Sequence, residues 1–291
     1  MLRAKLISSA IATLLGVTIA TAQWGSAPGA ITEGGENSQI DYSAREIKAT
    51  GIGAVPANAP NVGAARASAI RAAKMDALRN LVEAVKDVRI SSETTVENNM
   101  VANDVVKSKV EATVRGAQQE GDVRYLSDSS VEITMKVALS GIMDVVMPIT
   151  ATAPSGPLSI DAVPDAGTVP SISVATPGQP VTGLIIDARG LGIKPSMSPQ
   201  ILANDGTVLY GPGSYPREFA VQHGVVGYHK DIAAAQGDPR VVGNPLTVKA
   251  VATSGTLATD VVISKADSQQ AIGMNGFADA IGACRVMFIL D

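Results

Sequence analysis

The sequence predicts an α+β protein made of two mixed α/β domains joined by a proline-rich linker. The first domain carries a long segment of helical periodicity, residues 61–88, and a later strand-like alternation over residues 131–139. Short apolar runs separated by turn residues and helical stretches fill the last hundred residues. Between the two domains, residues 148–180 hold seven prolines and neither Lys nor Arg. A chain of 291 residues has room for two domains of roughly 100–150 residues each.

Residues 1–22 have the pattern of an export signal. Arg3 and Lys5 precede an apolar core over residues 7–20, and Ala20-Thr21-Ala22 fits the small-x-small cleavage pattern. We expect cleavage before Gln23. The apolar core is shorter than the ~20 residues of a membrane-spanning helix, and no later segment is uniformly apolar over that length. The mature protein is therefore expected to be periplasmic or secreted, without a transmembrane span.

Composition argues against nucleic acid as a partner. Loss of Arg3 and Lys5 with the signal would change the formal net charge from −4 to −6, and aromatic residues make up only 3% of the chain. Binding to nucleic acid needs cations for the phosphates and aromatic rings for the bases. The single cysteine, Cys284, excludes an intramolecular disulfide and is interpreted as a small buried hydrophobe.

A flexible lead-in is expected at residues 23–42, which are rich in glycine, and the first domain is expected at residues 43–147. In the helical segment 61–88, alanines, Ile70 and Leu81 recur at steps of three and four, which predicts an amphipathic helix that can lie close to a sheet. β-branched and extended patterns predict a strand on either side of this helix, at residues 46–55 and 88–96.

Residues 105–115 fit two patterns. Val106, Val110 and Val114 have helical spacing, but alternate residues also fit a strand; the helix is favoured because Gly116 offers a stop. The run 131–139 alternates apolar and polar side chains, and the turn residues 126–130 before it predict a hairpin. This order of elements predicts helices packed on one face of a mainly antiparallel sheet.

Proline favours an extended path, so residues 148–180 are expected to form a semi-rigid linker, the alternative being an ordered loop over a domain surface. The second domain is expected at residues 181–291, and Asn204-Asp205-Gly206 predicts a hairpin turn. The other elements expected there are a buried strand (181–190), a broken helix (216–236), a strand (259–267), a helix (268–282) and a closing strand (284–290).

Asp187 and Arg189 are the candidate binding residues of the second domain. They follow the apolar run Leu184 to Ile186, and residues two apart on a strand face the same side. The pair could therefore recognise a ligand at the rim of the sheet, or it could fix the loop that follows. The second interpretation is favoured, since the glycines after Arg189 do not form a dinucleotide-binding pattern.

Other patterns for catalysis are sparse. His223 and His229 are the only histidines, and their spacing of six residues does not place both on one helical face, so a metal site is not expected. No serine stands in a Gly-x-Ser-x-Gly pattern. Paired carboxylates stay open, because such pairs come from distant parts of a chain. No catalytic residue, metal or cofactor is expected.

The segment 65–100, "ARASAIRAAKMDALRNLVEAVKDVRISSETTVENNM", together with "VEATVRGAQ" and "VRYLSDSSVEITMKVAL", resembles the lipoprotein-twenty family of bacterial envelope proteins. That family is similar to the N-terminal domain of flagellar assembly protein T. The resemblance covers about a third of the chain. It implies a structural or assembly role in the envelope and no enzymatic activity.

A departure from this family is that no cysteine stands at the signal cleavage position, so a lipid anchor is not expected. The sequence thus predicts an exported, non-enzymatic structural protein. It would act through contacts with envelope proteins or with further copies of itself. The alternative is a small-ligand-binding or enzymatic role of the second domain around Asp187 and Arg189.

Overall fold

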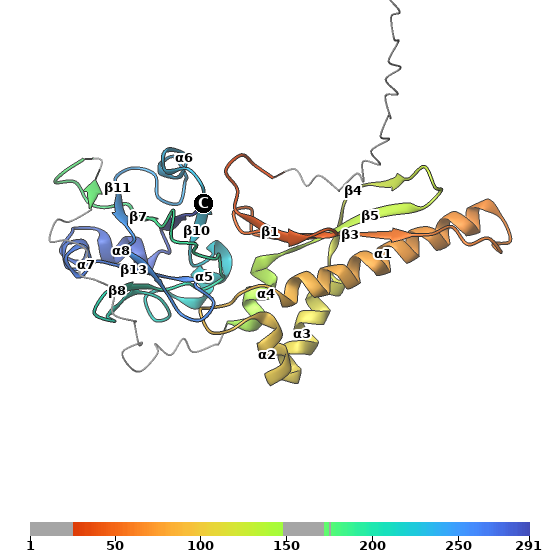
Figure 1. Ribbon diagram of the computed structural model, residues 1–291, viewed down its shortest axis with the longest axis horizontal. Helices are drawn as coiled ribbons and strands as arrows, with labels where there is room; N and C mark the ends of the chain where they lie inside the picture. Colours follow the sequence, from red (N-terminus) through yellow and green to blue (C-terminus); the bar gives the residue numbers. More distant parts are fainter. Residues whose placement is uncertain (1–25, 148–171, 175) are drawn as a thin grey trace, which may run out of the picture.

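A computed structural model describes residues 26–147, 172–174 and 176–291, arranged as two units side by side (Figure 1). The fold class is confirmed, because each unit combines helices with β-sheet. The expected signal peptide at residues 1–22 and most of the expected linker lie outside the described residues. Within the described part, no helix is both long and apolar enough to cross a membrane.

The first unit is a five-stranded antiparallel sheet with helices on one face, as predicted (Figure 1). Its strand order is β1 (Thr32–Gly35), β2 (Ser38–Asp41), β3 (Glu46–Gly53), β5 (Val131–Ala138) and β4 (Gln118–Tyr125). Its helices are α1 (Val62–Lys86), α2 (Val96–Ala102), α3 (Asp104–Arg115) and α4 (Leu139–Val146).

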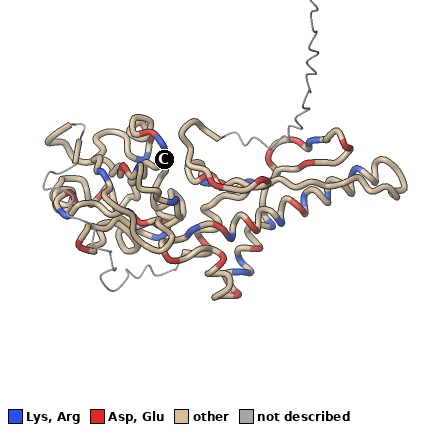
Figure 2. The backbone as a smooth tube through the Cα atoms, viewed as in Figure 1, with Lys and Arg blue, Asp and Glu red and all other residues tan. Residues whose placement is uncertain are grey.

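Helix α1 confirms the longest prediction from the sequence. Asn61 caps its start, with Oδ1 accepting a hydrogen bond from the Ala64 amide at 2.8 Å. A stripe of alanines ending at Leu81 is buried against the sheet, while charged residues lie on the other side (Figure 2). The alanines let the helix backbone approach β3 very closely. A Cβ atom placed on Gly51 would lie 2.0 Å from the Ala77 nitrogen.

Two expectations for the first unit are wrong. Within residues 23–42, taken as a flexible lead-in, Thr32 to Asp41 form β1 and β2, and the apolar Ile31, Ile40 and Tyr42 are buried. The strand expected at residues 88–96 is only a single bridge between Arg89 and Thr95.

The loop at residues 88–96 pairs with the second unit instead. The Arg89 and Ile90 carbonyls accept hydrogen bonds from the Met197 and Ser198 amides, at 2.9 and 2.8 Å. By contrast, the helix favoured over residues 105–115 is confirmed as α3, which ends at Gly116 as expected. The sequence patterns gave no sign of α4, which directly follows β5.

The second unit contains two sheets. One has the order β10 (Gly227–His229), β14 (Val286–Ile289), β7 (Gly183–Asp187), β11 (Pro245–Lys249) and β6 (Ser173–Val174), with β6 alone antiparallel. The other has the order β12 (Ala252–Ser254), β13 (Asp260–Ile263), β8 (Ile201–Ala203) and β9 (Val208–Tyr210). The helices are α5 (Arg217–His223), α6 (Ile232–Gln236), α7 (Lys265–Ile272) and α8 (Phe277–Gly282).

The expected strands around residues 183–187, 260–263 and 286–289, and the hairpin turn at Asn204, are confirmed. The broken helix expected over residues 216–236 is instead two short helices separated by β10, because Gly224 (φ 78°) ends α5. The helix expected over 268–282 is two helices, α7 and α8, separated at Gly276 (φ 83°).

The linker predicted at residues 148–180 extends too far toward the C-terminus. Ser173 and Val174 pair with β11, and the Asn244 side chain holds the next turn. Asn244 Oδ1 accepts from the Thr176 amide at 2.7 Å, and its Nδ2 donates to the carbonyls of Thr176 and Gln179. These contacts join the stretch from residue 172 to the second unit. The linker at residues 148–171 stays a prediction.

The two units share one hydrophobic core. Buried residues of α4 and β3 belong to the same cluster as buried residues of β7, β8 and β14. The N-terminal segment adds polar contacts to β10: the Lys230 amide donates to the Gly29 carbonyl at 3.0 Å, and Ser43 Oγ donates to the Tyr228 carbonyl at 2.7 Å. Part of the stretch expected to be flexible, at Gly29, therefore contacts the second unit.

Candidate functional site

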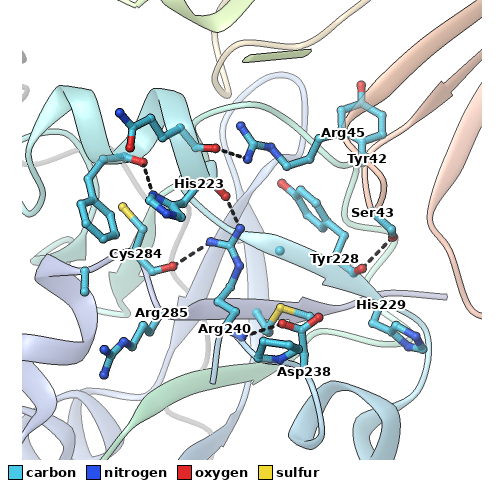
Figure 3. A pocket seen from close by; sticks show the side chains of 16 residues that line it. Tyr42, Ser43, Arg45, His223, Tyr228, His229, Asp238, Arg240, Cys284 and Arg285 are labelled. Carbon is cyan, nitrogen blue, oxygen red and sulfur yellow. Dashed lines mark hydrogen bonds between the residues drawn. The ribbon is translucent and has the colours of Figure 1, made fainter. Parts of the chain in front are cut away.

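A cavity of about 520 Å³ lies at the seam between the two units (Figure 3). The first unit contributes the turn between β2 and β3, and the second contributes β10, the end of α5 and the turns before β11 and β14. Its most polar lining residues are Ser43, Arg45, His223, His229, Asp238, Arg240 and Arg285. Three arginines against one aspartate give the lining of this cavity a net positive charge.

Two of these arginines hold the carboxyl end of α5. Arg45 Nη1 donates to the Gln222 carbonyl at 2.7 Å, and its Nη2 donates to the Val221 carbonyl at 3.0 Å. Arg240 Nη1 donates to the Gly224 carbonyl at 3.1 Å and to the Cys284 carbonyl at 2.8 Å, the second bond being drawn in Figure 3. Cations favour the carboxyl end of a helix, where carbonyls lack partners within the helix.

The two guanidinium groups are close enough to repel one another. Burial lowers the pKa of Arg45, and the nearby Arg240 lowers it further. Burial likewise lowers the pKa of Arg240, opposed by the charge of Asp238. Both groups stay charged, because an arginine pKa starts far above neutral pH. Arg45 and Arg240 thus tie the first unit and the last strands of the second unit to the same helix end.

Both histidines of the cavity wall have local partners. His223 stacks on Phe219 with ring centroids 4.3 Å apart, and its Nδ1 lies 3.3 Å from the Phe219 carbonyl. His229 Nδ1 accepts from the Asp231 amide at 2.9 Å. Among the described residues, no group of three or more His, Cys, Asp or Glu is placed to hold a metal ion.

Cys284 is among the residues that line the cavity and is fully buried, as the sequence predicted. Burial raises the pKa of its thiol, and the neighbouring Tyr210 and Arg240 offset part of that rise. A thiol with a raised pKa stays protonated near neutral pH and is a poor nucleophile.

The predicted pair Asp187 and Arg189 meets at the carboxyl end of β7. Arg189 Nε and Nη2 each donate to one Asp187 oxygen at 2.8 Å, a bidentate pair that lowers the pKa of Asp187. The Arg189 amide also donates to Asp187, and the Gly190 amide donates to Asp291 at 2.9 Å. This geometry matches the alternative in which the pair fixes the loop. Neither side chain lines the cavities described here, and ligand binding by the pair stays a prediction.

Sequence patterns did not indicate Arg45 or Arg240. The two residues are far apart along the chain, and each stands in a turn without a motif. Only their meeting at the end of α5 gives them a common role. The one available hint was Gly224, which marked a break in the helical pattern over residues 216–236.

A buried carboxyl group on β13, near the same seam, is expected to make the stability of the protein depend on pH. Asp260 is 1% exposed and accepts from the Gln200 amide at 2.9 Å. Burial raises its pKa, while hydrogen bonds from Ser92 of the first unit and from Gln200 lower it in part. In the native state Asp260 therefore holds its proton to a higher pH than it does in the unfolded chain.

We expect the Asp260→Asn variant to gain stability relative to the wild type as the pH rises from 4 to 7. The folded pKa lies above the unfolded value of about 3.9, so ionisation of Asp260 lowers wild-type stability as the pH rises through that window. Asparagine does not ionise and keeps an acceptor for the Gln200 amide. Thermal unfolding of both proteins at pH 4, 5, 6 and 7 measures the difference, and a difference in Tm that is constant with pH would contradict this assignment.

Comparison with known protein families gives two matches. The first covers residues 55–135, from the turn after β3 to the middle of β5. The first unit resembles the LPP20 lipoproteins. The second match covers residues 183–291, from β7 to the end of the chain, and is to the second domain of Treponema pallidum Tp0624. No curated protein matches the chain.

These matches divide the chain at the boundary between the two units. They support an envelope lipoprotein-like protein, and they confirm the resemblance of the first unit to the lipoprotein-twenty family. The similarity to flagellar assembly protein T stays a prediction. A match to lipoproteins weighs against the expectation that a lipid anchor is missing.

Proposed function

We propose that this protein is an exported, non-enzymatic structural protein of the bacterial envelope, which acts by binding envelope proteins or further copies of itself. The match of residues 55–135 to LPP20 lipoproteins supports the location in the envelope. An exposed apolar surface at the corner between α2 and α3 carries the proposal of protein contact. We call the surface formed by Val101 and Val105 the α2–α3 corner.

Val101, near the end of α2, is 83% exposed, and Val105, near the start of α3, is 61% exposed. The turn between the two helices separates them. Asn103 fixes this turn, because its Oδ1 accepts from the Val105 amide at 2.9 Å. A cavity of about 310 Å³ adjoins the corner and is lined by Met100, Val101, Lys86, Glu97, Asp104 and Lys107. Apolar side chains rimmed by charges are the usual composition of a protein-binding surface.

Val101 and Val105 are not among the residues that line the cavity at the seam. In Figure 1, α2 and α3 project below α1, on the side of the first unit opposite to β4. A partner bound at the corner would therefore leave the seam between the units in place.

The chemistry of the seam supports a non-enzymatic role. Both histidines are engaged with neighbouring groups, and the buried Cys284 has a raised thiol pKa. Arg45 donates to backbone carbonyls of the second unit and so joins the two units, while Arg240 donates to carbonyls within the second unit.

Photo-crosslinking in intact cells tests the proposed contact. A photoreactive phenylalanine analogue at Val101 is expected to give crosslinks to an envelope protein or to a second copy. The same analogue at Ile272, which is 60% exposed on α7, serves as the matched control and should give fewer. The Val105→Asp change should abolish the crosslinks from position 101 with little effect on stability, since exposed substitutions usually change it by about 0.5 kcal/mol or less. Equal crosslinking from positions 101 and 272, or no crosslinks at all, would refute the contact.

A further inference from the structure

A second cavity at the seam, of about 340 Å³, has an apolar wall and a polar end. It lies between α4 and the 90–94 loop of the first unit and the segments around residues 197–200 and 212–217 of the second. The apolar wall is formed by Ile90, Met143, Val146, Met147, Met197 and Pro212. Its volume falls near the lower end of the range of about 300–1,000 Å³ found for ligand pockets.

Three methionines dominate the apolar wall. Met143 and Met147 come from α4 and its end, and Met197 comes from the second unit, so the wall exists only where the two units meet. Methionine side chains are flexible and polarizable, and they adapt to ligands of irregular shape.

The polar end holds an unused acceptor. Gln200 Oε1 is buried and has no hydrogen-bond partner among the described residues. An unpaired buried acceptor lowers stability unless a ligand or a solvent molecule supplies a donor. Ser198 Oγ and Tyr215 Oη, which also line the cavity, lie 3.2 Å apart. Only one of their two hydroxyl hydrogens is needed for that bond, so the other can be donated to a ligand.

The charges at the rim favour a neutral ligand. Arg217 Nη2 is paired with Asp144 Oδ1 at 2.9 Å and also donates to the Asp144 carbonyl. The positive charge of Arg217 is therefore neutralised. A carboxylate is an acceptor only and cannot donate to Gln200 Oε1, whereas a hydroxyl or a primary amide can both donate and accept.

We propose that this methionine-lined cavity binds a small uncharged amphiphile, with an aliphatic chain against Met143, Met147 and Met197 and a hydroxyl or amide head at Gln200. The head donates to Gln200 Oε1 and accepts from the Ser198 and Tyr215 hydroxyl pair. The ligand bridges both units, so its binding also stabilises the seam. This role is independent of the protein contact at the α2–α3 corner.

The test uses the full chain labelled with ¹³C at its methionine methyl groups and titrated with 1-octanol or octanoate. 1-Octanol is expected to shift the signals of Met143, Met147 and Met197, while Met75, which is 68% exposed on α1, reports non-specific binding. Octanoate should bind roughly tenfold more weakly than 1-octanol, because the single lost hydrogen bond and the buried charge together exceed about 1.4 kcal/mol.

Two variants locate the site. Gln200→Leu should weaken 1-octanol binding by roughly three- to tenfold, as expected for one hydrogen bond, while Gln270→Leu, at an exposed position of α7, should not change it. Met147→Trp, a half-buried position at the mouth, should fill the cavity and remove the shifts of Met143 and Met197. Circular dichroism would verify that each variant folds, and Asn99→Trp, at another half-buried lining position, replaces Met147→Trp if that variant does not.

Three results would overturn the proposal. They are no shift of the three methionines with 1-octanol, binding of octanoate as tight as that of 1-octanol, or equal effects of Gln200→Leu and Gln270→Leu. A failed crosslink at Val101 would leave these results unchanged, because the α2–α3 corner and the cavity share no lining residue.

Discussion

The Gly51→Ala variant is expected to lose more than about 3 kcal/mol of unfolding free energy, the upper part of the range for overpacking. A Cβ atom on Gly51 would lie 2.0 Å from the Ala77 nitrogen and 2.3 Å from the Ala73 carbonyl oxygen. These are backbone atoms of α1, and they cannot turn aside as a flexible side chain could. The helix would have to move away from β3, and its stripe of alanines would lose contact with the sheet. Urea denaturation followed by circular dichroism measures the loss.

Gly35→Ala is the matched control for this variant. Gly35 also lies in a strand of the same sheet, but a Cβ atom there would meet nothing within 4 Å. This change should alter stability by less than about 0.5 kcal/mol. If the two variants unfold at the same urea concentration, the close approach of α1 to β3 is not the reason why position 51 requires glycine.

The periodicity of the sequence was sufficient to predict α1, because every turn of the helix repeats the same requirement for a small buried residue. The same pattern did not indicate which segment the buried alanines of α1 pack against. Gly51 and Gly53 occur in a strand-like segment, and only the structure shows that they face Ala69, Ala73 and Ala77. Two glycines at alternate positions beside an alanine-rich helix are the signal that could have indicated this contact.

The strand expected at residues 88–96 was wrong, because the hydrogen-bond partners of this segment lie far away in the sequence and a local pattern cannot show them. Its β-branched residues suit a strand, but Arg89 and Ile90 find their hydrogen-bond partners at Met197 and Ser198, in the other unit. The lead-in predicted at residues 23–42 was similarly misjudged, because its glycines suggested flexibility while Ile31, Ile40 and Tyr42 are buried.

The sites at the seam could not be predicted from the sequence for the same reason. Each cavity takes its lining from both units, and neither Arg45 nor Met143 stands in a motif. Asp187 and Arg189 were found because they are neighbours on one strand, which is the kind of pair that sequence spacing can reveal.

The Leu81→Asp variant is expected to lose several kcal/mol, enough to unfold the first unit at ordinary marginal stability. Leu81 is fully buried on the same face of α1 as the alanine stripe, within the core shared by the two units. Aspartate there would either bury an unpaired charge or hold a proton at neutral pH, and both states cost free energy relative to leucine. Because the core is shared, we expect the loss to appear in the melting of both units together.

Arg79→Asp is the control for this change, since it introduces the same side chain two residues away. Arg79 is 73% exposed and pairs with Asp76 on the surface of α1. Losing that pair and placing two acidic residues together should cost less than about 1 kcal/mol, the usual limit for exposed ion pairs. Calorimetry of the two variants separates burial from charge. Equal melting temperatures would mean that position 81 does not lie in the core, while a loss confined to one of two transitions would mean that the units do not share it.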